Sequence, residues 1–222
     1  MKLDFSSVWQ YWPFLYHGAL TTLKITAITA LFGFLLGVLL SLIKISKCRP
    51  LVWFGNFYTS IFRGTPLLVQ LCIVHFGLPQ LTGMTLTTMQ SGVLTFSLNS
   101  AAYISEIFRG GINAIDRGQY EAAMSLGVGY RDMMKDIILP QAVKHILPSL
   151  VNEAISLLKE SSILSYIGAV ELLRAADQIT VLTFRFFEPY LVIAVIYYVL
   201  VMLLSMVASW IERWVNRSDR VS

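Results

Sequence analysis

The stretch EAAMSLGVGYRDMMKDIILP, from Glu121 to Pro140, is the longest polar interruption in an otherwise apolar sequence. Its pattern predicts two short helices, over 121–126 and 131–139, which are joined by a turn at 127–129. Pro140 is expected to end the second helix, because proline lacks the amide hydrogen that a helix interior needs. Such a polar helix-turn-helix fits a solvated connection between apolar segments, so the fold depends on what those segments are.

The composition places these segments in a membrane. The chain has 222 residues, of which 56% are hydrophobic and 14% are charged, and its mean hydropathy is +0.66. Soluble domains carry about 25% charged residues, so a soluble fold is disfavoured. The net charge of +4 comes from basic residues beside apolar runs, as in juxtamembrane loops, and we expect no nucleic-acid partner. Cys48 and Cys72 lack the spacing of a metal site and are expected to stay unpaired.

Five apolar segments predict an all-α polytopic membrane protein with five transmembrane helices in one domain, residues 1–222. The segments cover about 18–43, 52–78, 88–109, 141–169 and 189–211. The first has 19 uncharged residues over 25–43, enough to cross about 30 Å of hydrocarbon, and it lacks a signal cleavage site. Gly33 and Gly37 within it are small residues four apart, which is typical either of close helix packing or of ordinary membrane glycine content.

The basic residues predict the orientation, because loops rich in lysine and arginine stay in the cytoplasm. The loop at 44–49 is purely basic, whereas the loop at 77–87 has no charge. We therefore expect the N-terminus and the loops at 77–87 and 171–188 outside the cell. The loop at 44–49, the polar loop at about 117–140 and the C-terminus are expected in the cytoplasm. The tail supports this side with three arginines, Arg213, Arg217 and Arg220.

The polar loop has the spacing of a known docking loop. Its signature positions are Glu121, Ala122, Ala123, Gly127, Ile137, Leu139 and Pro140. Three residues separate the EAA triplet from the glycine, nine more precede the isoleucine, and one more precedes the Leu-Pro pair. This pattern resembles the EAA loop of ABC importer permeases at every signature position.

Three other stretches resemble the polar amino acid permeases of that superfamily, the histidine, glutamine, arginine and cystine type. They are FRGTPLLVQ at 62–70, LNSAAYISEIFRGGI at 98–112 and LLKESSILSYIG at 157–168. With them the resemblance runs over about residues 14–213. It implies the type I ABC importer permease fold and a place in the bacterial cytoplasmic (inner) membrane.

The resemblance also implies a division of labour. Two permease subunits, either two copies of this chain or the chain and a paralogue, form the pathway for an amino acid substrate. Two ATP-binding cassette ATPase subunits dock on the cytoplasmic side and hold ATP and Mg, so this chain binds no cofactor of its own. A soluble extracytoplasmic amino acid-binding protein delivers the substrate. The EAA loop is then the coupling helix that fits a groove on the ATPase.

The residues themselves agree with a transport subunit that is not an enzyme. The chain has no Gly-Lys dipeptide and therefore no phosphate-binding loop, and it has no G-x-S-x-G or H-E-x-x-H motif. In the loop, Ala122 and Ala123 offer a small helix face for close docking, Glu121 a polar anchor, and Gly127 a sharp turn.

Polar residues inside a membrane are costly and therefore mark candidate substrate contacts. The candidates are Gln70, Asn99, Tyr103, Glu106, Lys159, Glu160 and Ser161. Those of the third segment fall at i, i+4 and i+7, on one helical stripe. The fourth segment is too polar to face lipid, and a helix break is expected over 159–162. Our hypothesis is a transient amino acid site at this break, because the backbone groups of a broken helix bind substrate charges.

Other interpretations of these residues stay open. Glu106 either contacts substrate or pairs with Arg109 or Arg63 as a charge scaffold, and Asn99 either contacts substrate or makes an interhelical hydrogen bond. Tyr103 is expected to pack. Lys159 and Glu160 either contact substrate or neutralise each other.

An alternative from another class is a secondary transporter or channel subunit that works without ATP. Such transporters often contain inverted repeats, but five segments do not divide into two equal halves and no repeat is visible. Co-purification with an ATPase discriminates between the two.

Overall fold

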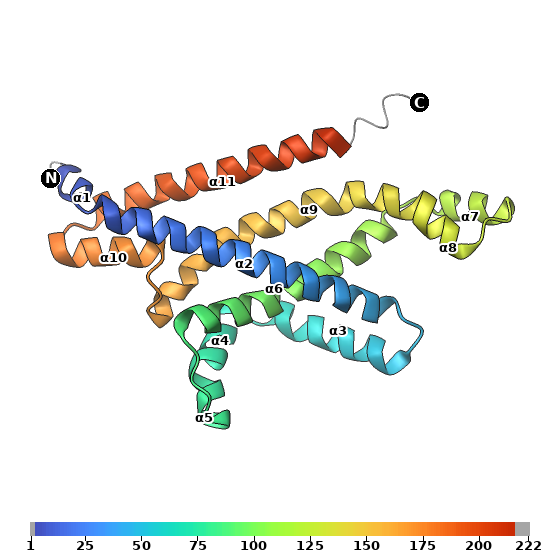
Figure 1. Ribbon diagram of the computed structural model, residues 1–222, viewed down its shortest axis with the longest axis horizontal. Coiled ribbons are helices and arrows are strands. Elements are labelled where there is room, and N and C mark those ends of the chain that lie inside the picture. The colour runs from blue at the N-terminus through green and yellow to red at the C-terminus, as the bar shows by residue number, and fades with distance from the viewer. Residues whose placement is uncertain (1–2, 216–222) are drawn as a thin grey trace.

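The computed structural model describes residues 3–215, and this part of the chain is helical with short connections (Figure 1). Arg217 and Arg220 of the predicted basic tail lie outside the described residues. The helical elements are α1 (Ser6–Trp9), α2 (Trp12–Ile45), α3 (Arg49–Gly64), α4 (Leu67–Cys72), π-helical η1 (Ile73–Gly77), α5 (Leu78–Thr82), α6 (Thr88–Asn113), α7 (Arg117–Ser125), α8 (Tyr130–Asp132), π-helical η2 (Met133–Ile138), α9 (Leu139–Glu160), 3-10 helical η3 (Ser161–Ile167), α10 (Leu172–Thr183) and α11 (Phe187–Val215).

The pair α2 and α6 forms the central contact of the fold. A Cβ atom at Gly33 would lie 2.9 Å from Ser100 Cβ, and one at Gly37 would lie 2.6 Å from Ile104 Cγ2. Both distances are shorter than real side chains allow, so the two glycines are what lets the helices approach. The close-packing interpretation of this glycine pair is therefore confirmed.

The second predicted segment, 52–78, is bent. Its two halves, Arg49–Gly64 and Leu67–Thr82, meet at 104°. Pro66 lacks an amide hydrogen and holds the preceding residue, Thr65, in an extended conformation with φ −123° and ψ 147°. The bend lies inside the predicted segment, because the proline stops α3 where the apolar composition continues.

Two helices in the described part of the chain are long and apolar enough to cross a membrane by themselves, α2 and the Phe187–Arg213 part of α11. The bent pair gives a third span if it crosses as one unit. The helices α6 and α9 match the third and fourth predicted segments in position but carry more polar residues. The count of five spans therefore stays a prediction.

Pro140 does not end the helix that precedes it. The backbone stays helical from α8 through η2 into α9, and Pro140 lies in the first turn of α9. The π turns of η2 shift the hydrogen-bond register just before the proline, so its missing amide hydrogen interrupts no regular ladder. The prediction of a helix that stops at Pro140 was wrong, and the polar loop is continuous with the fourth segment.

The two ends of the molecule carry different elements (Figure 1). The elements α7 and α8 lie at one end, toward which the connection between α2 and α3 also points. The elements α1 and α10 lie at the opposite end, beside the first turns of α2 and α11. This arrangement puts the polar loop and the helix break after α9 at opposite ends of one long helix.

Candidate functional site

The polar loop folds as a helix with a tight glycine cap. Asp116 caps α7 by accepting a hydrogen bond from Gly118 N at 2.6 Å. At the other end Gly127 has φ +73°, and Val128 N donates to Ala123 O at 3.0 Å. A left-handed residue after a helix normally has to be glycine, so the predicted turn at 127–129 is confirmed.

Ala122 and Ala123 do not form one docking face. Ala123 is buried against Met133, Ile138 and other apolar residues of η2 and α9, whereas Ala122 is exposed. Neighbouring helix residues point about 100° apart, which the proposal of a shared small-residue face ignored. Ala123 therefore fastens α7 to the following helix, and only Ala122 is available to a partner.

The surface of the loop carries large apolar side chains that sequence reasoning missed. Met124, Leu126 and Tyr130 are 61%, 82% and 69% exposed, and they surround the Gly127 turn. Glu121 is also exposed and lines a pocket of about 610 Å³ together with Arg117. The signal that could have found them is in the sequence, where large apolar residues flank a turn within a polar loop.

The remaining signature positions lie on the connection to α9. Ile137 is half-buried, and Leu139 and Pro140 are exposed. Their role in docking stays a prediction.

Gln70 and Asn99 bridge the break between α3 and α4. Asn99 Nδ2 donates to Gln70 Oε1 at 3.0 Å and to Phe62 O at 3.0 Å. Gln70 Nε2 donates to Phe62 O, Thr65 O and Thr65 Oγ1 at 2.8–3.1 Å. These bonds satisfy carbonyl groups that the end of α3 leaves without helical partners. The geometry therefore matches the interhelical interpretation of Asn99 and gives Gln70 a structural role.

Glu106 is the centre of a charge cluster. Its carboxylate contacts Lys44 of α2 and Arg109, whose Nη2 lies 2.5 Å from Oε2, while Arg63 Nη1 lies 3.5 Å away. Arg63 also lies over the ring of Tyr103, 5.3 Å from its centroid. The charge-scaffold interpretation of Glu106 was open in the sequence, but Lys44 was missed because 62 residues separate it from Glu106.

The predicted helix break at 159–162 is confirmed, since α9 ends at Glu160 and continues as the 3-10 helix η3. Ser161 is fully buried and its hydroxyl donates to Leu158 O at 2.7 Å, so it caps the break. Glu160 is half-buried, and Lys159 beside it is exposed. No salt bridge joins these two residues in the described part of the chain, so both interpretations of the pair stay open.

Glu153 belongs to the same region, two helical turns before Glu160. Ser100 Oγ of α6 donates to Glu153 Oε1 at 2.7 Å. The two half-buried glutamates lie on one side of α9, seven residues apart. Among the polar groups of the membrane segments, Glu160 keeps hydrogen-bonding capacity that no described residue uses, unlike Gln70, Asn99 and Glu106.

Comparison with known proteins gives the family. Residues 30–218 match the family described as binding-protein-dependent transport system inner membrane component. The chain is 51% identical over 219 residues to the arginine transport system permease protein ArtQ of Bacillus subtilis strain 168, covering 99% of this chain and 100% of that protein. It is 50% identical over 200 residues to a putative glutamine transport system permease protein GlnP of Rickettsia felis, covering 90% and 92%.

Solved structures agree with this assignment. A chain of the crystal structure of an amino acid ABC transporter with histidines is 45% identical, with a TM-score of 0.92, and 96% of this chain covers 99% of that one. An inward-facing MetNI methionine ABC transporter, 22% identical with a TM-score of 0.74 over 92% and 97% of the two chains, shows the shared fold. The chain has the type I ABC permease fold, and it belongs to the family of binding-protein-dependent transport system inner membrane components as an amino acid ABC transport permease.

Proposed function

We propose that this chain couples amino acid import to ATP hydrolysis by two separate ATPase subunits, with α7 and its glycine turn as the docking element. The observation that carries the proposal is mechanical. The exposed apolar residues around Gly127 lie at the end of α7, in the turn after it and at the start of α8. Ala123 fastens α7 to a helix that runs unbroken from α8 to Glu160. A rigid displacement of the loop by a partner is therefore passed to the far end of α9.

The orientation follows from this assignment. The docking element faces the cytoplasm, where ATP is available, and α1 and α10 at the opposite end face outward. An extracytoplasmic amino acid-binding protein would deliver substrate there, and a second permease, either identical or a paralogue, would complete the pathway. The basic connection at 44–49 lies toward the α7 end, in agreement with the positive-inside rule (Figure 1).

The substrate is a polar amino acid, and we place its transient site at the end of α9. Glu160, with Glu153 a short distance away, offers carboxylate oxygens to an ammonium group, and the exposed Lys159 offers a donor for a carboxylate. The α-to-3-10 transition at Ser161 adds backbone groups to the same place. Relatives named for arginine and glutamine transport are consistent with a substrate of this class.

The test is reconstitution of the chain with an ABC ATPase and an amino acid-binding protein in proteoliposomes. We expect uptake of labelled amino acid that needs ATP and is blocked by vanadate. Uptake by the chain alone, driven by a proton or sodium gradient, would instead identify a secondary transporter.

Docking is tested by a substitution on the loop with a matched control. Leu126→Asp places a charge in the exposed apolar surface and should reduce co-purification of the ATPase at least about tenfold, as loss of a hot-spot residue does. Leu3→Asp makes the same change on an exposed leucine at the opposite end and should leave co-purification unchanged. Equal effects of the two substitutions would contradict docking at α7.

A further inference from the structure

The helix α10 is held in a fixed position beside the first turns of α2. A Cβ atom at Gly18 would lie 3.0 Å from Leu172 Cα, so the backbones approach closely there. Leu172 N donates to Thr22 Oγ1 at 3.3 Å. The buried side chain of Glu171 caps α10 by accepting from Leu173 N and Arg174 N, both at 2.8 Å. A site on the outer face of α10 is therefore built on a rigid element.

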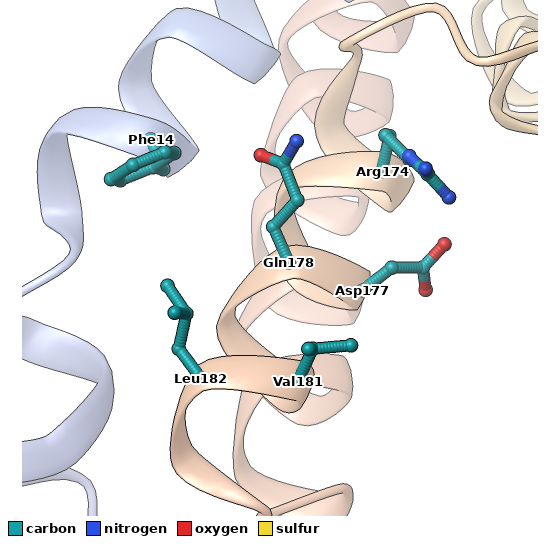
Figure 2. Close-up of a pocket in the computed structure, with 6 residues that line it drawn as sticks. All are labelled: Phe14, Arg174, Asp177, Gln178, Val181 and Leu182. Atoms are coloured by element: carbon teal, nitrogen blue, oxygen red, sulfur yellow. The ribbon is translucent and has the colours of Figure 1, made fainter.

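One face of α10 lines a pocket that the proposed mechanism does not use. The pocket has a volume of about 340 Å³, within the range of small-molecule sites. Its lining residues are Arg174, Asp177, Gln178, Val181 and Leu182 of α10 and Phe14 of α2. Figure 2 shows Phe14 across a gap from α10, with the Gln178 amide between Phe14 and Arg174 and the Arg174 and Asp177 side chains extending in the same direction.

The polar groups of this pocket keep unused hydrogen-bonding capacity. Gln178 Oε1 is buried and has no hydrogen-bond partner among the described residues. The guanidinium group of Arg174 is exposed and makes no salt bridge within residues 3–215. Asp177 accepts one hydrogen bond, from Tyr190 Oη to Oδ1 at 2.7 Å, which leaves its other oxygen available. A buried amide oxygen without a partner is costly, so a ligand that donates to it is favoured.

We propose that this pocket is an entry site for a free amino acid at the extracytoplasmic mouth of the permease. Arg174 binds the α-carboxylate, Asp177 and Gln178 Oε1 accept from the α-ammonium group, and the side chain of the ligand lies against Phe14, Val181 and Leu182. Both charges of the zwitterion are matched in sign, and guanidinium is well suited to a carboxylate. The proposal rests on the proposed import of amino acids and names a second site on the same route.

The entry site is separate from the site at the end of α9. It shares no residue with Glu153, Lys159 or Glu160, and the 3-10 helix η3 and the connection before α10 lie between the two in sequence. Substrate released outside would reach α10 first and the end of α9 next. The two sites therefore predict two binding events per chain.

The direct test is equilibrium dialysis of the permease–ATPase complex in nanodiscs, without binding protein, with labelled L-arginine and L-glutamine. We expect two sites per permease chain. Glu160→Gln should remove one of them. Arg174→Gln and Asp177→Asn should each weaken the other roughly tenfold or more, because hydrogen bonds to charged groups are lost. Gln10→Ala, a change of an exposed amide at the same end of the molecule, should leave both sites intact.

The role of Arg174 is isolated with agmatine, which is arginine without its carboxylate. Arg174→Gln should weaken arginine binding at the entry site but leave agmatine binding unchanged. One site per chain that only Glu160→Gln removes would overturn the proposal. So would unchanged amino acid binding in Arg174→Gln with a loss of binding-protein-stimulated ATPase activity, since the pocket would then dock that protein. Wild-type complex without any ATP-dependent import would instead contradict the proposed function.

Discussion

The polar loop and the polar interior of this permease use charged and polar residues in opposite ways. In the loop, Glu121 and the apolar residues around Gly127 are exposed and point away from the chain. In the interior, Glu106 and Asn99 are surrounded by partners from other helices. Exposed groups remain available to another molecule, whereas groups that satisfy one another mainly hold the fold. A residue is therefore assigned to a binding site when it has hydrogen-bonding or charged groups that no other residue of the chain uses. The polarity of the residue alone does not show this.

The largest effect is expected at Glu106. Glu106→Gln removes the charge that compensates Lys44, whose side chain is only 5% exposed. Breaking a buried pair by removing one partner costs about 3–5 kcal/mol, which should appear as a large fall in the thermal stability of the purified protein. Arg109→Gln is the control, because the Arg109 side chain is 55% exposed and its loss should cost about 1 kcal/mol or less. A Glu106→Gln protein with unchanged stability and altered substrate affinity would contradict the structural role and indicate that Glu106 contacts substrate.

Gln70 separates a structural role from a substrate role. Gln70→Ala leaves the carbonyls of Phe62 and Thr65 without its amide donor and should cost about 1–3 kcal/mol of stability. The KM for uptake should not change once activity is expressed per folded protein. Glu160→Gln should do the reverse, raising KM with little loss of stability. If Gln70→Ala raised KM as much as Glu160→Gln, Gln70 would belong to the substrate site.

A substitution of Gly127 tests whether the polar loop acts in coupling and not in substrate preference. Gly127→Ala forces alanine to φ +73°, a strain of about 1–2 kcal/mol, without touching any other atom within 4 Å. We expect more ATP hydrolysed per amino acid imported and unchanged substrate preference. Gly129→Ala is the matched control, because Gly129 has φ −63° and a Cβ there meets only Asp132 Oδ2 at 3.7 Å. Altered preference with normal coupling would contradict the separation of the two regions.

The same contrast explains what was predictable from the sequence. The loop is contiguous, so residue spacing was enough to predict its turn, and the helix break after Glu160 had an equally local signal. The contact of Lys44 with Glu106 joins two segments that are distant in sequence. The pattern of five apolar segments does not show which residues of different segments meet, so this contact could not be predicted. Pro66 and Pro140 show a limit of local rules, since one breaks a helix by 104° and the other lies within a continuous one. The two prolines differ in the backbone that precedes them, which is π-helical before Pro140 and extended before Pro66. The identity of the residue as proline does not encode this difference.

The smallest effect is expected at the N-terminal end, where Asp4 makes hydrogen bonds with Ser6 and an ion pair with Arg185 at the surface. Hydrogen bonds from the side chain and backbone of Ser6 hold the pKa of Asp4 below its usual range, and Arg185 Nη2 lies 3.6 Å from Asp4 Oδ2. Because the folded-state pKa is lowered, the stabilisation is fully present above the unfolded-state pKa of about 3.9 and is lost as pH falls through the folded value.

Asp4→Asn should therefore reduce stability slightly at neutral pH and flatten its fall between about pH 5 and pH 3, measured by thermal unfolding across that range. The effect at Asp4 is small because the carboxylate is exposed and solvent screens its interactions. A loss of stability in Asp4→Asn as large as that in Glu106→Gln would contradict this explanation. It would mean that the number of partners of a charged group determines its contribution to stability and that its burial does not.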